Sequence, residues 1–196
     1  MSKKKRKNIP SRIERQVLKE FNHRCAKCGG DKFQMHHIDE DPSNNDPMNL
    51  IPLCPNCHLY DQHNPTQSID QEKLRLLRKH KDPTILKPQF HPLFKRMQFL
   101  NFVKEDSNVE ELDRNAEELV EFINTLNMGK FYSKKVGELI RIPRHPGIEF
   151  IGNPESERLS ELHREKNNKE YREKLCKIKD QVYSLVIESL SYQNWQ

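Results

Sequence analysis

Two C-x-x-C pairs constrain the fold of this chain more than any other feature of its sequence. Cys25 and Cys28 form the first pair, and Cys54 and Cys57 form the second about 25 residues later. Each short loop lets two thiolates bind the same ion, and the segment between the pairs can fold as a hairpin. This spacing is typical of a tetrahedral zinc site. We therefore predict that the four cysteines bind one structural Zn²⁺.

The remaining cysteine indicates the compartment. Cys176 lies far from the two pairs, in a charged pattern typical of a helix. Four metal-binding cysteines and one free thiol favour a reducing compartment over a disulfide scaffold. No apolar run approaches the roughly 18 residues of a membrane span, and no apolar signal-peptide core follows the basic start of the chain. We expect a soluble, cytoplasmic protein without a membrane partner.

Charge is distributed unevenly along the chain. Residues 1–105 contain 20 Lys and Arg against 12 Asp and Glu, a net charge of +8, whereas residues 106–196 contain 14 against 17, a net charge of −3. A polyanion would therefore bind the amino-terminal part. The candidate nucleic-acid contacts are the basic residues of the tail and of the first cysteine loop: Lys3, Lys4, Lys5, Arg6, Lys7, Arg24 and Lys27. The alternative for the tail is a solvated, disordered segment.

A helix is predicted before the first cysteine pair. Ser11 and Glu14 fit a capping box, and apolar residues follow at helical spacing. Gly29 and Gly30, directly after the pair, are expected to supply the positive-φ freedom that the turn beside the metal needs.

The segment between and after the pairs predicts a ββα unit. Residues 32–38 alternate in the manner of a strand, and residues 50–53 form a second short strand. Residues 39–49 are rich in proline, asparagine and acidic residues, which favours an irregular loop. A short helix is expected over residues 55–63.

The remainder of the chain is predicted to be mainly helical. Caps and apolar spacing indicate helices starting at Ser68 and over residues 94–103, 109–126 and 153–191, while residues 130–152 are expected to be irregular. Only 34% of the residues are hydrophobic, which favours elongated helices or a surface completed by a partner. The apolar stripes of 109–126 and 175–190 should pack on each other or against a second chain, as in a homodimer or a complex with another protein.

These elements give the fold class α+β, a small zinc-stabilised unit followed by a mainly α-helical region. The expected domains are a basic flexible tail over residues 1–10 and a zinc-stabilised ββα domain over 11–65. A helical basic connector over 66–105 and a helical interaction or dimerisation region over 106–196 follow.

Four further residues add to the cysteine pairs to form a recognisable order. His36-His37 ends the first predicted strand, Asn49 opens the second, and His58 directly follows Cys57. This order resembles the zinc-stabilised form of the HNH endonuclease family, and the resemblance covers roughly residues 11–64. Residues 65–196 carry no such resemblance.

The resemblance implies that residues 11–65 form an HNH ββα-metal nuclease domain and that the protein is a metal-dependent endonuclease. In that family the first histidine of the doublet binds the catalytic cation and the second is the general base, roles that carry over to His36 and His37. His58 would be the second protein ligand, and His63 is a candidate further ligand. Asn49 would hold the loop and fix the base imidazole. The family uses Mg²⁺ or Mn²⁺ for turnover, and the substrate would be nucleic acid, with DNA the first choice.

The chemistry of phosphodiester hydrolysis agrees with these roles. The reaction needs a base for water and a cation for the charge that develops on the phosphate. Adjacent strand residues point to opposite faces, so His36 and His37 should have different tasks.

Two alternatives stay open. The chain could be the nuclease effector subunit of a restriction or phage-defence complex that is active only with a partner. It could also be a non-catalytic zinc-knuckle module that binds nucleic acid. The intact His37 favours the enzyme, because a pure binding module has no need of a base.

Overall fold

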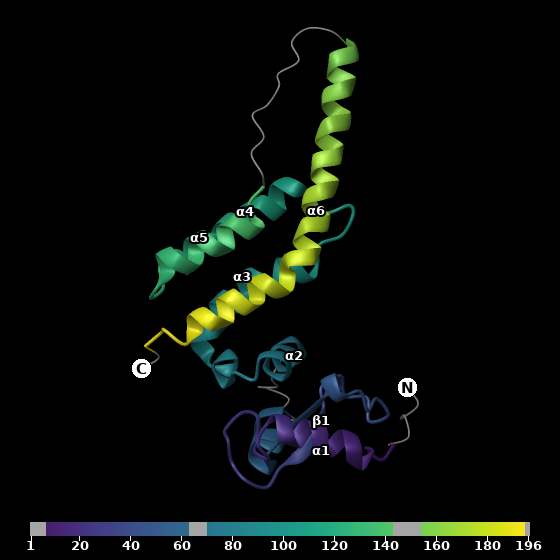
Figure 1. The fold of residues 1–196 in the computed structure, drawn as a ribbon, viewed down its shortest axis with the longest axis vertical. Coiled ribbons are helices and arrows are strands. Elements are labelled where there is room, and N and C mark those ends of the chain that lie inside the picture. Colours follow the sequence, from purple (N-terminus) through teal and green to yellow (C-terminus); the bar gives the residue numbers. More distant parts are fainter. Residues whose placement is uncertain (1–6, 63–69, 143–153, 195–196) are drawn as a thin grey trace. The chain divides into compact units, whose positions relative to one another are not determined.

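The computed structural model describes residues 7–62, 70–142 and 154–194 (Figure 1). The chain divides into two compact units, Met1–Pro88 and Gln89–Gln196. The first combines a small two-stranded sheet with helices, and the described part of the second is helical. The mixed α+β composition predicted from the sequence is therefore confirmed. No helix in the described ranges is both long and apolar enough to span a membrane.

The sheet of the first unit is an antiparallel pair of four-residue strands. In β1 (Gln34–His37) and β2 (Leu50–Leu53), His36 lies opposite Ile51. The predicted second strand is confirmed, whereas the first is shorter than the predicted 32–38. Lys32 has φ 60°, outside the extended region, so the strand cannot include it.

Three helical segments accompany the sheet. They are α1 (Ser11–Glu20), a π-helical turn η2 (Cys57–Gln62) and α2 (Gln71–His80), with short 3₁₀ turns η1 (Pro47–Asn49) and η3 (Pro83–Leu86). The η2 turn lies within the predicted short helix over 55–63.

Both predicted helix starts in this unit need correction. The capping box at Ser11 is wrong, because α1 begins directly after Pro10 and no side chain caps it. Proline has a fixed φ and suits a helix entry without a polar cap. The cap of α2 is Asp70, whose carboxylate accepts a hydrogen bond from the Glu72 amide at 2.8 Å. Ser68 lies outside the described residues.

The core of the first unit includes three of the zinc-candidate cysteines. One buried cluster joins them to apolar side chains of the sheet and of α2: Cys25, Ala26, Ile38, Ile51, Leu53, Cys54, Cys57, Leu74 and Leu77. The boundary between the units falls inside the segment 66–105 that was expected to be a connector. This segment is divided because Leu74 and Leu77 of α2 are buried in the first core.

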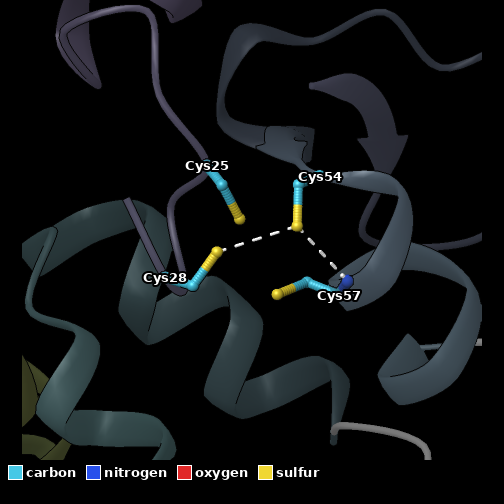
Figure 2. Close-up of side chains that lie close together, drawn as sticks. All are labelled: Cys25, Cys28, Cys54 and Cys57. Carbon is cyan, nitrogen blue, oxygen red and sulfur yellow. Dashed lines mark hydrogen bonds between the residues drawn. The ribbon is translucent and has the colours of Figure 1, made fainter. Parts of the chain in front are cut away.

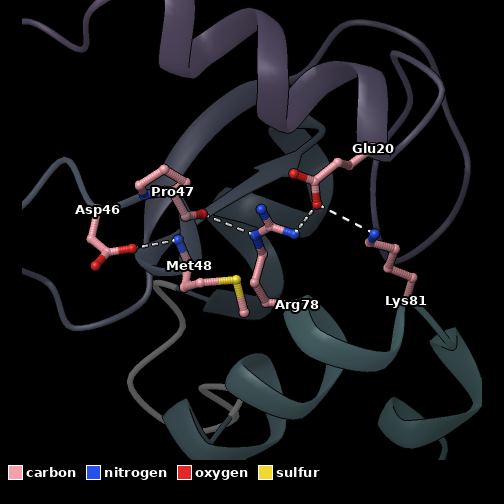
Figure 3. A network of polar contacts seen from close by, with 6 residues as sticks. All are labelled: Glu20, Asp46, Pro47, Met48, Arg78 and Lys81. Carbon is pink, nitrogen blue, oxygen red and sulfur yellow. Dashed lines mark hydrogen bonds and ion pairs between the residues drawn. The ribbon is translucent and has the colours of Figure 1, made fainter.

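A buried arginine ties α1, η1 and α2 together (Figure 3). The Arg78 side chain is 2% exposed, and its Nη1 lies 2.7 Å from Glu20 Oε2. Its Nε donates to the Pro47 carbonyl at 3.0 Å. The hydrogen bond from Arg78 lowers the pKa of Glu20 to about 2, and Lys81 Nζ, 3.3 Å from the same oxygen, contributes. The buried guanidinium of Arg78 is thus both paired with a carboxylate and hydrogen-bonded to the backbone.

We expect Glu20→Gln to destabilise the first unit by about 2 kcal/mol at pH 7, because it leaves the buried Arg78 charge without a counter-ion. Since the folded pKa lies below the usual 4.5, the stabilisation by Glu20 is present above pH 4.5 and is lost as pH falls towards about 2. Urea unfolding in excess zinc should show a constant difference between wild type and variant from about pH 8 to about pH 5.5. A difference that shrinks near neutral pH would contradict the assignment to Glu20.

The second unit is built from four α-helices in its described part (Figure 1). They are α3 (His91–Met97), α4 (Val109–Asn124), α5 (Gly129–Ile140) and α6 (Pro154–Leu190), with a 3₁₀ turn η5 (Gln98–Asn101). The predicted helices over 109–126 and 153–191 are confirmed. The predicted helix over 94–103 is replaced by α3, which starts earlier, and the turn η5.

The helix α5 corrects the prediction that residues from 130 onward are irregular. A tight turn precedes it: Met128 has φ 58°, and a Cβ at Gly129 would lie 2.5 Å from the Asn124 carbonyl oxygen. Tyr132, Val136 and Ile140 then recur every fourth residue and are buried. Two glycines inside the segment and the prolines after it concealed this periodicity. Residues 143–153 lie outside the described ranges.

The two predicted apolar stripes are covered within the chain. The inward residues of α4 and α6, among them Leu119, Ile123, Val182 and Val186, are buried. Helix α5 packs against both α4 and α6. Because both stripes are buried, they give no reason to expect a second chain. Dimerisation therefore stays a prediction without this support.

Candidate functional site

The four predicted cysteines converge on one point (Figure 2). All four sulfur atoms lie within 4.8 Å of one another. The Sγ atoms of Cys28 and Cys54 are 3.7 Å apart. A tetrahedral zinc site with Zn–S bonds of about 2.3 Å needs sulfurs about 3.8 Å apart. The cluster therefore has the donor set and the spacing to hold a zinc ion.

The first cysteine loop closes around this point through its glycines. The Gly29 amide donates to the Cys25 carbonyl at 2.9 Å, and Gly29 has the predicted positive φ, 70°. Gly30 does not have the positive φ that was expected of it. A Cβ there would, however, lie 3.3 Å from Cys28 Sγ. Its missing side chain leaves room for the sulfur.

The thiol electrostatics favour a bound cation. A hydrogen bond from the Cys57 amide, 3.5 Å from Cys54 Sγ, lowers the pKa of Cys54 to about 7. Burial and the neighbouring thiols raise the pKa of Cys57 well above its usual value. Four thiolates this close repel one another, so full ionisation requires a positive ion between them.

Three imidazoles come together from β1 and from the turn that follows the last cysteine. His36 and His37, in β1, are only 4% and 8% exposed. His58 follows the last cysteine in η2, where its amide donates to the Cys54 carbonyl at 2.8 Å. The His36 and His58 rings approach edge to face, with centroids 5.2 Å apart. The fold thus pairs two histidines that are distant in sequence.

The three histidines line one groove of about 810 Å³. Two carboxylates, Glu14 and Glu40, also line it, and none of its described lining residues is a lysine or an arginine. The groove therefore combines imidazole nitrogens with acidic oxygens, which are donor types suited to a cation.

His36 and His37 have different partners, as their adjacent strand positions predict. His36 contacts His58, whereas His37 Nε2 lies 3.1 Å from Asn45 Oδ1. The amide nitrogen of Asn45 donates in turn to the Asn8 carbonyl at 3.0 Å.

Asn49 braces the loop between the strands. Its Oδ1 accepts from the Asp39 amide at 3.0 Å, and its Nδ2 donates to Asp39 Oδ1 at 2.8 Å and to the Asn44 carbonyl at 3.0 Å. The two tasks expected of Asn49 are thus divided between two asparagines. It holds the loop, while the imidazole contact is made by Asn45. Sequence reasoning missed Asn45 because three asparagines in this loop look alike until the backbone places them.

Three acidic residues of this loop, Asp39, Asp41 and Asp46, accept hydrogen bonds within it. Burial by itself would raise the pKa of Asp39, but hydrogen bonds from Asn44, the Asp41 amide and Asn49 lower it. Asp41 accepts from the Ser43 hydroxyl at 2.7 Å, and Asp46 accepts from the Met48 amide at the same distance. These carboxylates are engaged inside the loop.

The predicted nucleic-acid contacts lie in two places. The Lys7 amide donates to the carbonyl of Pro42, a groove-lining residue, at 3.2 Å. Arg24 and Lys27 belong to the first cysteine loop and do not line the groove. The other nucleic-acid candidates, Lys3 to Arg6, lie outside the described residues, as does His63, the candidate further metal ligand.

Within the described ranges, the four cysteines form the single group of three or more His, Cys, Asp or Glu donors close enough to hold a metal. Compared with protein-family models, curated proteins and solved structures, the chain matches none.

Proposed function

We propose that this protein is a metal-dependent HNH endonuclease that hydrolyses phosphodiester bonds in DNA. The observation that supports it most is the meeting of His36 and His58, with ring centroids 5.2 Å apart, in a groove that His37 also lines. His36 and His37 come from β1 and His58 from the π-helical turn η2, where a ββα-metal unit would have its first strand and its helix. His58 directly follows Cys57, a member of the cysteine cluster that fits zinc.

Each histidine has a separate task in this proposal. His36 and His58 would hold a divalent cation, Mg²⁺ or Mn²⁺, with water and phosphate oxygens completing its coordination. Such a cation, when bound, neutralises charge that develops on the phosphate and the leaving oxygen. His37, on the same groove but with a different partner, takes the proton from the attacking water. The cysteine cluster holds the strand and the turn that carry these residues.

Substrate binding needs positive charge that the groove lining does not supply. The hydrogen bond between Lys7 and Pro42 fixes the end of the basic tail at the edge of the groove. We infer that Lys7 contacts the phosphates that flank the scissile bond and that this contact weakens with salt.

The direct test is incubation of zinc-loaded protein with supercoiled plasmid, with Mg²⁺ or Mn²⁺ and without either cation. We expect relaxed or linear product with either cation and none without. His163→Ala, which removes an exposed histidine of α6, serves as a control and should cut like wild type. Binding of plasmid without any cleavage under all conditions would instead support a non-catalytic zinc-knuckle module. A single-stranded RNA substrate in parallel separates DNA from RNA preference.

A further inference from the structure

The side-chain amide of Asn45 is held in one orientation. Its Nδ2 lies 3.0 Å from the backbone carbonyl of Asn8. A carbonyl oxygen can only accept a hydrogen bond, so the amide nitrogen must face Asn8. The amide oxygen must then face His37, where it lies 3.1 Å from Nε2.

This orientation determines which nitrogen of His37 carries the hydrogen. An amide oxygen accepts and cannot donate, so His37 Nε2 must be the donor. In a neutral imidazole the other nitrogen, Nδ1, then holds the lone pair. The contact of Asn45 with Nε2 thus selects the tautomer of His37. It leaves Nδ1 as the hydrogen-bond acceptor of a ring that lines the groove.

We propose that Asn45 is a positioning residue that holds His37 in the Nε2–H tautomer, so that Nδ1 takes the proton from water. This inference rests on the proposed nuclease function. It assigns to Asn45 the imidazole contact that the family resemblance assigns to Asn49, which here bonds to Asp39 and Asn44.

The segment before α1 belongs to the same arrangement. Asn8 precedes the helix, and its carbonyl is the group that orients the Asn45 amide. Removing residues 1–9 should therefore release the amide, whereas removing residues 1–6 should not.

The tautomer can be measured without any nuclease activity. Nitrogen NMR of histidine-labelled protein, with His37→Gln to assign the resonance, distinguishes a protonated Nε2 from a protonated Nδ1. We expect Nε2–H in wild type and in the chain lacking residues 1–6. Mixed tautomers are expected in Asn45→Ala and in the chain lacking residues 1–9. A wild-type ring protonated at Nδ1, or a tautomer that Asn45→Ala does not change, would overturn the proposal.

Kinetics test whether the contact matters to the reaction. At saturating plasmid, Asn45→Ala should lower kcat about 10- to 100-fold with little change in KM, as is typical for residues that orient a reactive group. Asn45→Asp keeps an acceptor for Nε2–H and should retain more of kcat than Asn45→Ala. In a His37→Ala background, Asn45→Ala should cause no further loss, because there is no ring left to orient.

A matched control separates this contact from the integrity of the loop. Asn44 lies in the same loop, and its side chain bonds to Asp39 rather than to His37. Asn44→Ala should leave the His37 tautomer unchanged and kcat within about twofold of wild type. An equal loss of kcat in Asn44→Ala and Asn45→Ala, with zinc content and thermal unfolding unchanged, would overturn the positioning role. If wild type never cleaves, the proposed function fails, yet the tautomer measurement still decides the contact.

Discussion

Replacing Cys25 with serine is expected to unfold the first unit. Cys25 is buried in the core and belongs to the four-sulfur cluster. Structural zinc contributes an apparent 10–16 kcal/mol in small zinc-binding domains near pH 7, about as much as the whole stability of a domain this size. Metal analysis should find about one Zn²⁺ per chain in wild type and almost none in the variant. Circular dichroism should show partial loss of structure, because the helices of the second unit do not depend on this cysteine.

The matched control for this prediction is Cys176→Ser. Cys176 is exposed on α6 and is not a member of the cluster. This variant should retain zinc and unfold at the wild-type temperature. A Cys25→Ser protein that keeps its fold without zinc would show that the cysteines are ordinary core residues.

The second large effect is expected at His37. If it is the general base, His37→Ala should reduce plasmid cleavage on the order of 10²- to 10⁴-fold. DNA binding and zinc content should persist, because His37 belongs to neither the cysteine cluster nor the buried apolar cluster of the first unit. Loss of its hydrogen bond to Asn45 should cost only about 1 kcal/mol of stability.

Rates of plasmid nicking under single-turnover conditions measure this effect. Gel shifts of zinc-loaded protein with DNA, without added Mg²⁺ or Mn²⁺, measure binding. His36→Ala should differ from His37→Ala in that added cation restores part of its activity, because a metal ligand and not the base has been removed. A His37→Ala enzyme that cuts near the wild-type rate would refute the assignment of the base.

The local parts of the fold could be predicted from the sequence. The spacing of Cys25, Cys28, Cys54 and Cys57 indicated one cluster, because two short loops restrict the thiols to a common point. Val109 to Asn124 repeats apolar residues at helical spacing, so α4 followed from the pattern. The run 50–53 lies between loop residues and forms β2 at those bounds.

Helix α5 shows where local signals were insufficient. Its two glycines lower its helical propensity. It forms because Tyr132, Val136 and Ile140 are buried and because α5 packs against α4 and α6. Burial of this kind stabilises a weak helix by tertiary contacts, which no short window of sequence contains.

The candidate site divides in the same way. The sequence by itself determined the residue types and their order: four thiols, a histidine doublet and a histidine after the last cysteine. The family resemblance predicted that His36 and His58 lie close together, and their rings do. Only the tertiary structure decided that Asn45, rather than Asn49, contacts His37. The physical reason is that spacing along a strand or a turn restricts neighbours, whereas the partner of a side chain depends on backbone segments that fold back from elsewhere in the chain. The segment that contains Asn8 is an example, because the Asn8 carbonyl orients the side chain of Asn45, which lies 37 residues further along the chain.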